Sequence, residues 1–495
     1  MDTRLLQQLK GWNPWWQEGP GGIKRFGVPE FKRESYAQIA SVYQRRQQAV
    51  SIVGLRQVGK TTIMHQCIQE LLEQGIPPRH IFYLSFEDSY LTAKYNLKTL
   101  FHDIVAAYAE HILNDELAHT NAKLYFFFDE VHRLPNWATS VKTYYDQHAP
   151  IAFMVSGSAS FGMQKSKGDS LLGRMVEFTL YPFSFREAVL FWESEQERIK
   201  EDEKQQLHGV IESCREAGEE FFSQGALLAL HGKLESTFKS AAVWHGRRMQ
   251  EHLRRYVLEG GFPRVWQQTD EYSKHRHLIE QHVQKVIRED LPQMAKVRKV
   301  RELEALYISL LDRVGEETVF SDLAKDINIS PSILEKYLRY LQKTFLMFPV
   351  ERTKTKNVLR QRRASRMKFY AMDATVRAAV LKSRNDIFDN PDEMGIYAEN
   401  LVASALARRL SGRAGSGIWY YRESNRYEVD FIVKEGESLL PIEVKWRENI
   451  PALASLDRLG DKWGLKESVL VTRDHDFTYR DGRLSIPLWF FILLI

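Results

Sequence analysis

The 495-residue sequence predicts an α/β protein, and two observations support this fold class. Apolar runs of strand length alternate with helical stretches in the first 180 residues: 49–53, 81–86, 124–128, 151–155 and 176–180. Strands that are apolar throughout and are linked by helices form parallel sheets that are covered on both faces. In addition, a glycine-containing loop directly follows the first run and leads into a helical pattern. We therefore expect a parallel sheet with a ligand at the carboxyl ends of its strands.

The loop fits the phosphate-binding pattern G-x-x-x-x-G-K-[ST] at every fixed position. Its glycines allow the tight turn that aims backbone N–H groups at a phosphate, and the helix predicted at 62–74 adds its dipole. Lys60 is expected to reach the β- and γ-phosphates of ATP, and Thr61 to offer its hydroxyl to Mg²⁺. The alternative is a structural turn that contains glycine. The residues expected around the nucleotide are Gly54, Arg56, Gln57, Val58, Gly59, Lys60, Thr61 and Thr62.

Two carboxylates, Asp129 and Glu130, end the third apolar run. Asp129 is placed to hold Mg²⁺ through water, and Glu130 to polarise the water that attacks the γ-phosphate. Acids also end strands as helix caps, which is the alternative. The hydroxyls of Ser156 and Ser158, after the fourth run, could read the γ-phosphate or position water. Arg174 could neutralise charge during phosphoryl transfer, from this subunit or from a neighbour, although alone it would be a surface arginine.

A helix-turn-helix pattern covers residues 321–344. Ser330 is a good N-cap and Pro331 a good first helical residue, so the second helix is predicted to begin there. Apolar strands at 345–350 and 367–372 follow, as in a winged helix. The second helix is expected to expose Ser332, Lys336, Arg339 and Tyr340.

The segment between those two strands is strongly basic, with eight Lys and Arg residues and no acid over 352–368. A run of this density on a wing suits the phosphate backbone of DNA. A solvated loop or a protein interface are the alternatives, because winged helices also serve as dimer and domain contacts. The side chains expected to contact DNA are Lys336, Arg339, Arg360, Arg362, Arg363 and Arg366.

A second group of charged residues lies near the C-terminus: a helix bears Glu399, a strand bears Asp430, and the next strand bears Glu443 and Lys445. Glu443 and Lys445 are two apart and face the same side of their strand. Asp430 and Glu443 offer the oxygen ligands that Mg²⁺ or Mn²⁺ prefers, and Glu399 can join from the helix. Lys445 could then activate water or stabilise a pentavalent phosphate, so that a phosphodiester bond is cut. The alternative is a silent site in which these charges form a surface network.

Several motifs together resemble one family, a large bacterial and archaeal group of AAA-type ATPases. They are Gly54 to Thr62, Phe128 to Val131, Ser156 to Ser158, Gly173-Arg174 and Tyr181 to Glu187. The resemblance implies an ATPase with a helical lid, a winged helix and a C-terminal domain of the PD-(D/E)xK nuclease-like fold, whose four characteristic positions look filled here. The chain departs from the group at 193–243, a charged insertion that we predict to be a solvated helical hairpin.

These patterns divide the chain into five predicted segments. They are an N-terminal arm (1–47), an AAA-type ATPase core (48–190), a helical insertion and lid (191–300), a winged helix with a basic wing (301–375) and a PD-(D/E)xK nuclease-like domain (376–495). Three tryptophans in the arm, Trp12, Trp15 and Trp16, are predicted to pack it onto the next domain, and stacking on the adenine of the nucleotide is the alternative. Ile486 to Ile495 is predicted to be a closing core strand.

Composition narrows the class of protein and its partners. Hydrophobic residues at 44% and charged residues at 27% are globular values, and the net charge of +5 is modest. Two cysteines exclude a disulfide framework, predict no disulfide-linked partner and suit a reducing cytoplasm. The longest apolar run is shorter than the ~18 residues that span a bilayer, so no membrane is expected.

Two functions fit these features. The first is an ATP-hydrolysing, DNA-binding protein with a metal-dependent endonuclease-like C-terminal domain, using Mg²⁺ with ATP and Mg²⁺ or Mn²⁺ at the second site. The second is a signal-transducing ATPase switch that binds DNA or protein partners and retains a catalytically silent nuclease fold. In either case the chain could assemble with copies of itself.

Overall fold

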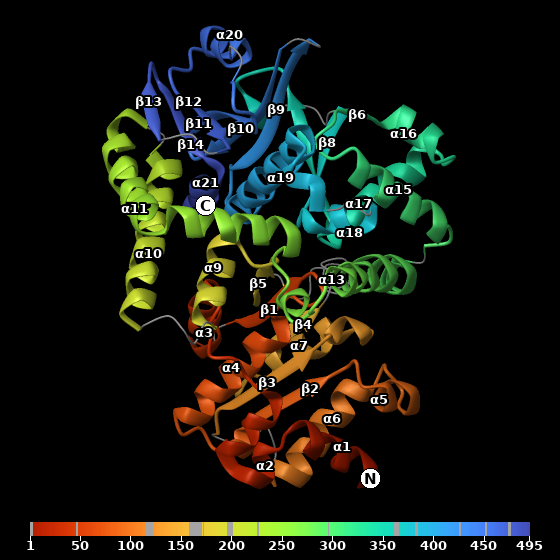
Figure 1. Cartoon of the computed structure of the whole chain (residues 1–495). Coiled ribbons are helices and arrows are strands. Elements are labelled where there is room, and N and C mark those ends of the chain that lie inside the picture. Colours follow the sequence, from red (N-terminus) through yellow and green to blue (C-terminus); the bar gives the residue numbers. More distant parts are fainter. Residues whose placement is uncertain are drawn as a thin grey trace. The chain divides into compact units, whose positions relative to one another are not determined.

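The computed structural model describes residues 3–45, 48–114, 122–157, 171, 173–195, 201–224, 227–295, 297–360, 366–381, 385–424, 427–450, 453–473 and 477–495. The chain divides into two compact units, Met1–Leu180 and Tyr181–Ile495. Each unit contains a β-sheet of its own, and Figure 1 traces the elements of both in sequence order.

The first unit is built on a parallel five-stranded sheet in the order β2-β3-β4-β1-β5. Every residue of β1 to β4 is buried, which means that both faces of these strands are covered. The five predicted strands are confirmed, with ends that shift by at most two residues: β1 (Ala49–Gly54), β2 (Ile81–Ser85), β3 (Leu124–Asp129), β4 (Ile151–Gly157) and β5 (Met175–Leu180).

A terminal arm covers the edge strand β2 of this sheet. The buried side chain of Asn13 donates to the carbonyl of Tyr83 at 2.9 Å and accepts from its N–H at 2.7 Å. The indole N–H groups of Trp15 and Trp16 both donate to the carbonyl of Ile81, at 3.0 and 2.8 Å. These bonds occupy backbone groups that an edge strand leaves unpaired, so the predicted packing of the arm is confirmed. The arm consists of α1 (Thr3–Trp12), α2 (Trp15–Glu18) and η1 (Gly19–Phe26).

Helices complete the first unit. The helix after the loop, predicted at 62–74, is α4 (Lys60–Glu73), so it begins directly at the lysine of the motif. The others are α3 (Tyr36–Arg45), η2 (Pro78–His80), α5 (Ser89–Lys94), α6 (Leu100–Tyr108), η3 (Ala109–Leu113), η4 (Val131–Arg133) and α7 (Trp137–Asp146).

The second unit contains a mixed nine-stranded sheet in the order β13-β14-β12-β11-β10-β9-β7-β8-β6. β7 is antiparallel to β8 on one side and parallel to β9 on the other. Strands that the sequence assigns to a winged helix and to a separate nuclease-like domain therefore belong to one sheet. The bounds are β6 (Thr318–Val319), β7 (Met347–Thr353), β8 (Arg366–Ala371), β9 (Gly417–Ser424), β10 (Tyr427–Glu435), β11 (Ser438–Lys445), β12 (Ser468–Thr472), β13 (Thr478–Arg480) and β14 (Arg483–Pro487).

Two helices, α16 (Phe320–Asp326) and α17 (Pro331–Lys343), form where the helix-turn-helix pattern was predicted. Ser330 caps α17 as expected, because its hydroxyl accepts from the N–H of Ile333 at 3.4 Å. Tyr340 was expected on the exposed face, and this is wrong: it is 6% exposed and its hydroxyl donates to the carbonyl of Ala295.

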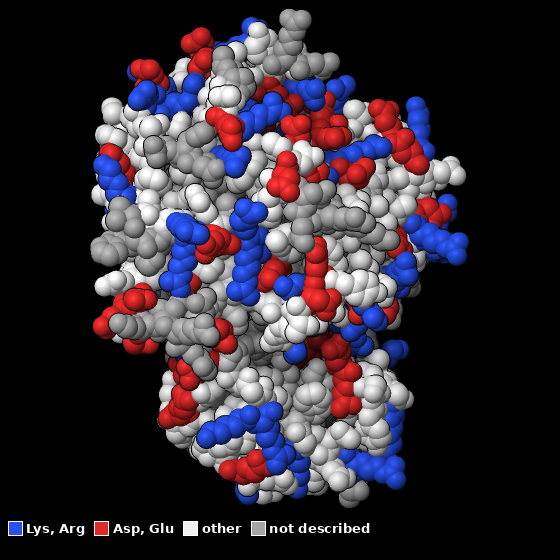
Figure 2. Space-filling model, in the orientation of Figure 1, with Lys and Arg blue, Asp and Glu red and all other residues white. Residues whose placement is uncertain are grey.

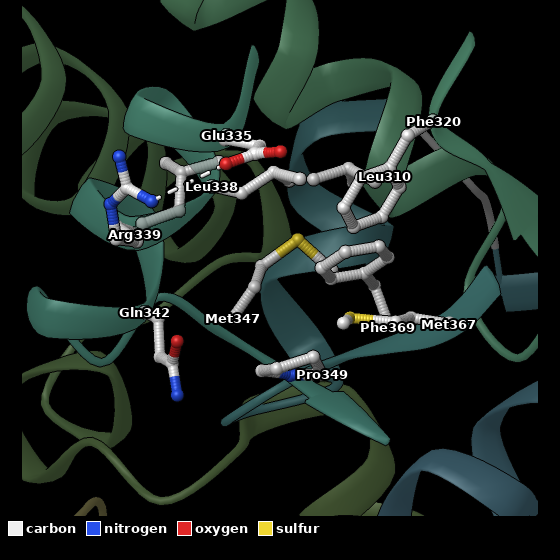
Figure 3. Close-up of a pocket in the computed structure, with 11 residues that line it drawn as sticks. Leu310, Phe320, Glu335, Leu338, Arg339, Gln342, Met347, Pro349, Met367 and Phe369 are labelled. Carbon is white, nitrogen blue, oxygen red and sulfur yellow. Dashed lines mark ion pairs between the residues drawn. The ribbon is translucent and has the colours of Figure 1, made fainter. Parts of the chain in front are cut away.

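The apolar face of α17 packs over α15 (Val300–Asp312) and the β7–β8 hairpin. Figure 3 shows Leu310, Met347 and Phe369 converging beneath this helix, around a cavity of about 20 Å³. A cavity of that size has room for about one water molecule, so this seam is a packed core. On the polar side of α17, Glu335 and Arg339 form an ion pair at 3.6 Å.

The charged insertion forms α10 (Glu201–Gln224) and α11 (Leu227–Glu259), which pack against each other. It is not simply solvated as predicted, because α10 and α11 also cover the C-terminal helix α21 (Leu488–Leu494). The rings of Phe238 and Phe490 lie 5.2 Å apart, and Gly218 leaves no space for a Cβ beside the carbonyl of Leu494. The closing strand predicted for 486–495 is also wrong, since β14 ends at Pro487 and a buried helix follows.

Further helical segments complete the second unit, among them α19 (Pro391–Leu410), which confirms the helix predicted to bear Glu399. In the described ranges, no helix combines the length and the apolar character that crossing a membrane requires. The segments are α9 (Phe185–Ser194), α12 (Pro263–Trp266), α13 (Glu271–Leu278), η5 (Ile279–Asp290), α14 (Leu291–Ala295), η6 (Val358–Arg360), α18 (Thr375–Leu381), η7 (Asn385–Phe388), α19 (Pro391–Leu410) and α20 (Ala454–Trp463).

Candidate functional site

The loop between β1 and α4 has the backbone that a phosphate site requires. A Cβ on Gly54 would overlap the carbonyl oxygen of Leu180 on β5, so only glycine fits there. Gly59 at φ 98° and Gln57 at φ 63° adopt left-handed conformations that turn the loop into the helix. The buried guanidinium of Arg33 donates to the carbonyl of Val58 at 2.7 Å and holds the loop from the arm side. The backbone geometry of the loop therefore fits the predicted binding of a phosphate.

Lys60, the lysine of the motif, is 5% exposed, and its Nζ donates to two carbonyls of the loop. The distances are 3.2 Å to Gly54 and 2.8 Å to Leu55. The ammonium thus lies inside the loop, at the N-terminus of α4, where phosphate oxygens can replace the carbonyls as its acceptors.

Thr61 and Asp129 meet across the loop and the end of β3. The threonine hydroxyl donates to Oδ2 of Asp129 at 2.6 Å, and the hydroxyl of Tyr83 donates to the same oxygen at 3.3 Å. Ser156, which the sequence suggested for the γ-phosphate, instead donates to Oδ1 of Asp129. A hydroxyl and a carboxylate beside a phosphate loop are the oxygen donors that suit Mg²⁺, so Thr61 and Asp129 fit that ion. Bound there, Mg²⁺ would offset the negative charge of the phosphates.

Glu130 follows Asp129 in a left-handed conformation, with φ 52°, a strained geometry for a residue with a side chain. Its N–H donates to the hydroxyl of Ser156 at 3.2 Å, and this bond holds Glu130 in that conformation. Burial raises the pKa of Glu130 to about 7, and the nearby cation Lys60 opposes that rise. A carboxylate with a pKa near neutrality is suited to accept a proton from water. His132 Nδ1, which the sequence did not suggest, lies 3.2 Å from Oε2 of Glu130.

Three more residues, Arg56, Thr62 and Ser158, were predicted to lie around the nucleotide. Arg56 forms an ion pair with Glu87 at 3.1 Å, and Thr62 is half-buried in the first turn of α4. Ser158 lies outside the described residues.

The predicted role of Arg174 at the nucleotide site of its own subunit is wrong. It precedes β5, whose first residue pairs with Ala49 at the start of β1, while the nucleotide loop follows the opposite end of β1. Its guanidinium forms an ion pair with Asp146 at 3.0 Å. Arg174 therefore lies at the amino edge of the sheet and does not reach the loop of its own chain.

The four nuclease-like residues of the second unit do come together, on α19, β10 and β11. The N–H of Asp430 donates to Oε2 of Glu443 at 3.3 Å, and Lys445 Nζ lies 2.5 Å from Oε1 of Glu443. Asp430 and Glu443 are 8% and 6% exposed, and Glu399 reaches the cluster from α19. Burial and the charge of Asp430 raise the pKa of Glu443 to about 8. Burial likewise raises the pKa of Glu399.

A lysine that the sequence did not suggest, Lys368 on β8, enters this cluster. Its Nζ lies 2.6 Å from Glu428, 3.2 Å from Glu399 and 3.9 Å from Asp430. Within the described ranges, no three His, Cys, Asp or Glu side chains are grouped so as to hold a metal ion. The cluster as arranged therefore does not fit the predicted Mg²⁺ or Mn²⁺, because an ammonium already lies among its carboxylates.

Some cations of the basic segment 352–368 form ion pairs with acidic side chains of the same unit. Arg366 forms an ion pair with Glu317 at 2.8 Å, and Arg352 lies 3.5 Å from the same carboxylate. Lys336 is exposed on α17 next to Arg339, which is paired within its helix. Basic and acidic side chains are interspersed over the face shown in Figure 2. Arg362, Arg363 and the side chain of Arg360 lie outside the described part of the chain.

Comparison with protein families gives three matches along the chain. A family described as an AAA domain matches residues 46–189. Two families described as domains of unknown function match residues 250–386 and 394–491.

Two curated proteins are similar over most of this chain. An uncharacterized protein of Methanocaldococcus jannaschii is 24% identical over 405 residues, which cover 80% of this chain and 74% of that protein. An uncharacterized protein of Haemophilus influenzae is 21% identical over 463 residues, which cover 91% and 95%.

Solved structures overlap more weakly. A Walker-type ATPase of Pyrococcus abyssi has a TM-score of 0.35 at 14% identity, covering 71% of this chain and 96% of that one. AMPPCP-bound DnaA of Aquifex aeolicus has a TM-score of 0.25 at 14% identity, covering 65% and 90%. Neither score reaches 0.5, so the assignment rests on the site geometry and the family match. Residues 46–189 are an AAA-type P-loop ATPase domain.

Proposed function

We propose that this chain is an ATP-hydrolysing protein whose second unit binds DNA without cutting it. The proposal of ATP hydrolysis rests on the 2.6 Å contact between Thr61 and Asp129, because this contact brings the phosphate loop next to the carboxylates at the end of β3. Glu130 accepts the proton of the attacking water, and Lys60 stabilises charge on the phosphates.

The proposal of DNA binding is supported by the order of elements from 300 to 371. This order is helix, short strand, two helices and two strands, with β6 and β7 both antiparallel to β8. That is the arrangement of a winged helix, in which the last helix enters the major groove. Lys336 and Arg339 are exposed on α17, and Lys354 and Lys356 are exposed on the segment after β7. The first two would contact bases or phosphates, and the second two the backbone.

Cutting of DNA is not part of the proposal. A metal-dependent nuclease needs carboxylate oxygens that are open to a divalent ion, whereas Lys368 lies among those of Glu399, Glu428 and Asp430. The second function predicted from the sequence, a nucleotide-dependent switch with a silent nuclease fold, agrees better with this arrangement.

If Arg174 acts in phosphoryl transfer, it acts on a neighbouring copy of the chain. This follows from its place at the amino edge of the sheet, away from its own loop. An assembly of several copies is therefore part of the proposal, and Arg174→Ala should lower ATP hydrolysis without weakening ATP binding.

The test of DNA binding is fluorescence anisotropy of a labelled duplex with the full chain at several salt concentrations. The double variant Lys336→Glu/Arg339→Glu should weaken binding and reduce the salt dependence by about one unit of slope for each lost contact. The matched control is Lys239→Glu/Arg247→Glu, two exposed cations of α11, which should bind as the wild type does.

Unchanged affinity and slope in the α17 double variant would refute DNA binding through this helix. The same assay tests the switch. DNA affinity of the Glu130→Gln variant should differ between the nucleotide-free and the ATP-bound protein, and equal affinities would remove the coupling from the account.

A further inference from the structure

Lys368 is a lysine in the interior of the second unit. It lies on β8, and its side chain is only 3% exposed. Arg366 and Tyr370 are each two residues away and therefore face the same side of the strand as Lys368. Burying an ammonium is strongly unfavourable unless charged partners surround it. Lys368 therefore needs the carboxylates around it, and they need a cation.

The partners come from two other elements. Glu399 lies on α19, and Glu428 and Asp430 lie on β10, with oxygens at 3.2, 2.6 and 3.9 Å from Lys368 Nζ. The hydroxyl of Tyr370 donates to Oε1 of Glu399 at 2.6 Å, the same oxygen that Lys368 contacts. The cluster thus surrounds the ammonium as ligands surround a metal ion.

Three other oxygens of the cluster are also occupied. Oδ2 of Asp430 accepts the N–H of Val444 at 2.9 Å, and Oε2 of Glu443 accepts the N–H of Asp430 at 3.3 Å. Oε1 of Glu443 faces the ammonium of Lys445. Mg²⁺ demands near-octahedral oxygen ligands at about 2.1 Å, and these carboxylates already satisfy N–H donors instead.

Cations of the chain itself offset most of the negative charge of the cluster without a divalent ion. Arg422 lies 3.3 Å from Glu428, so Lys368, Lys445 and Arg422 supply three positive charges. Four carboxylates, those of Glu399, Glu428, Asp430 and Glu443, face them.

We propose that Lys368 is a built-in cation that takes the place of the divalent metal ion in the nuclease-like cluster. The ammonium supplies the neutralising charge and the cross-links between β8, β10 and α19 that a metal would otherwise supply. Unlike a metal ion, an ammonium does not act as a Lewis acid that activates a bound water molecule or phosphate oxygen. The inference rests on the non-cutting part of the proposed function and is independent of DNA binding.

The test is Mn²⁺ binding to the full-length, nucleotide-free protein, measured as bound Mn²⁺ per chain by equilibrium dialysis. Lys368→Met, which keeps most of the length of the side chain and removes its charge, should bind one more Mn²⁺ per chain than the wild type. Adding Asp430→Asn to that variant should remove the extra ion. The control is Lys462→Met, because Lys462 pairs with Glu423 at the surface and its loss should add no site.

A thermal melt gives a second readout of the same variants. Lys368→Met should melt below the wild type, since its carboxylates lose their partner, and Mn²⁺ should restore much of that loss. Mn²⁺ should shift the wild type and Lys462→Met by equal, smaller amounts.

Two results would overturn the inference. One is a folded Lys368→Met variant that binds no more Mn²⁺ than the wild type. The other needs no Lys368 variant: if Asp430→Asn in the wild-type background lowers the bound Mn²⁺ by one per chain, the native cluster holds a metal. The anisotropy assay described above would still decide DNA binding, so failures of the two proposals are distinguishable.

Discussion

The hydroxyl of Thr61 lies 2.6 Å from Oδ2 of Asp129, which brings the first turn of α4 to the end of β3. A hydrogen bond to a carboxylate contributes about 1.5–3 kcal/mol. In the proposed function the same two oxygens are the donors expected for Mg²⁺. Under the proposed function, this contact positions the two groups that would hold Mg²⁺ before the ion binds.

Thr61→Val should raise the Mg²⁺ concentration needed for half-maximal ATP hydrolysis about ten- to hundredfold, which corresponds to the loss of one such interaction. Thr61→Ser keeps the hydroxyl and should restore most of the Mg²⁺ affinity. A titration of Mg²⁺ against steady-state hydrolysis checks both. Equal Mg²⁺ dependence in the valine and serine variants would contradict a role for the hydroxyl.

Lys60→Ala and Glu130→Gln should separate ATP binding from ATP hydrolysis. Lys60 contacts phosphates, so its loss should weaken binding, measured with a fluorescent ATP analogue. Glu130 acts on water, so the glutamine variant should bind ATP normally and hydrolyse it about 10²–10⁴-fold more slowly. Full turnover by Glu130→Gln would remove that residue from the mechanism.

His65 predicts a pH dependence of stability. It is buried between the rings of Phe26 and Tyr83, with centroids 4.3 and 4.7 Å away, and burial lowers its pKa to about 4. The unfolded chain, with an ordinary His pKa near 6.5, binds this proton at a higher pH than the folded chain does. Stability due to His65 is therefore present above about pH 6.5 and is lost as the pH falls towards 4, by up to about 3 kcal/mol.

His65→Phe should lack this part of the pH dependence, which denaturant unfolding between pH 4.5 and 7 would show. The exposed His148, replaced by Asn because its φ is 54°, is the control and should leave the pH dependence unchanged. Identical slopes in His65→Phe and the wild type would refute the assignment.

Two glycines of α10 test the packing of the insertion against α21. A Cβ at Gly218 would overlap the backbone of Leu494, whereas Gly209 has open space around it. Gly218→Ala should lower the melting temperature, because backbone must move to admit the methyl group. Gly209→Ala should leave it unchanged or raise it slightly, since alanine favours a helix by about 1 kcal/mol over glycine. Equal effects of the two changes would mean that α10 does not pack against α21 in solution.

The nucleotide site could be predicted from the sequence because its signal is local. The residues from Gly54 to Thr61 form one turn and the start of one helix. Asp129 ends another strand of the same parallel sheet, and the carboxyl ends of parallel strands lie at one edge. The same rule would have excluded Arg174 from its own site, since a residue before a parallel strand lies at the amino edge.

Lys368 could not be predicted in the same way. Its partners Glu399, Glu428 and Asp430 are 31 to 62 residues away, and the contact depends on β7 pairing with β9, which no local pattern signals. The apolar run from Leu488 to Leu494 shows a second limit. A short run that is buried on all sides has the same composition as a helix or as a strand, so periodicity does not decide between them.

The most direct test of the account is one incubation of the purified wild-type chain with ATP, Mg²⁺ or Mn²⁺, and supercoiled, linear or branched DNA, followed on a gel. The account predicts that ATP is hydrolysed while every DNA substrate stays intact. DNA cleavage by the wild type that disappears in Asp430→Ala would contradict it, because the cluster around Lys368 would then be a working metal-dependent nuclease.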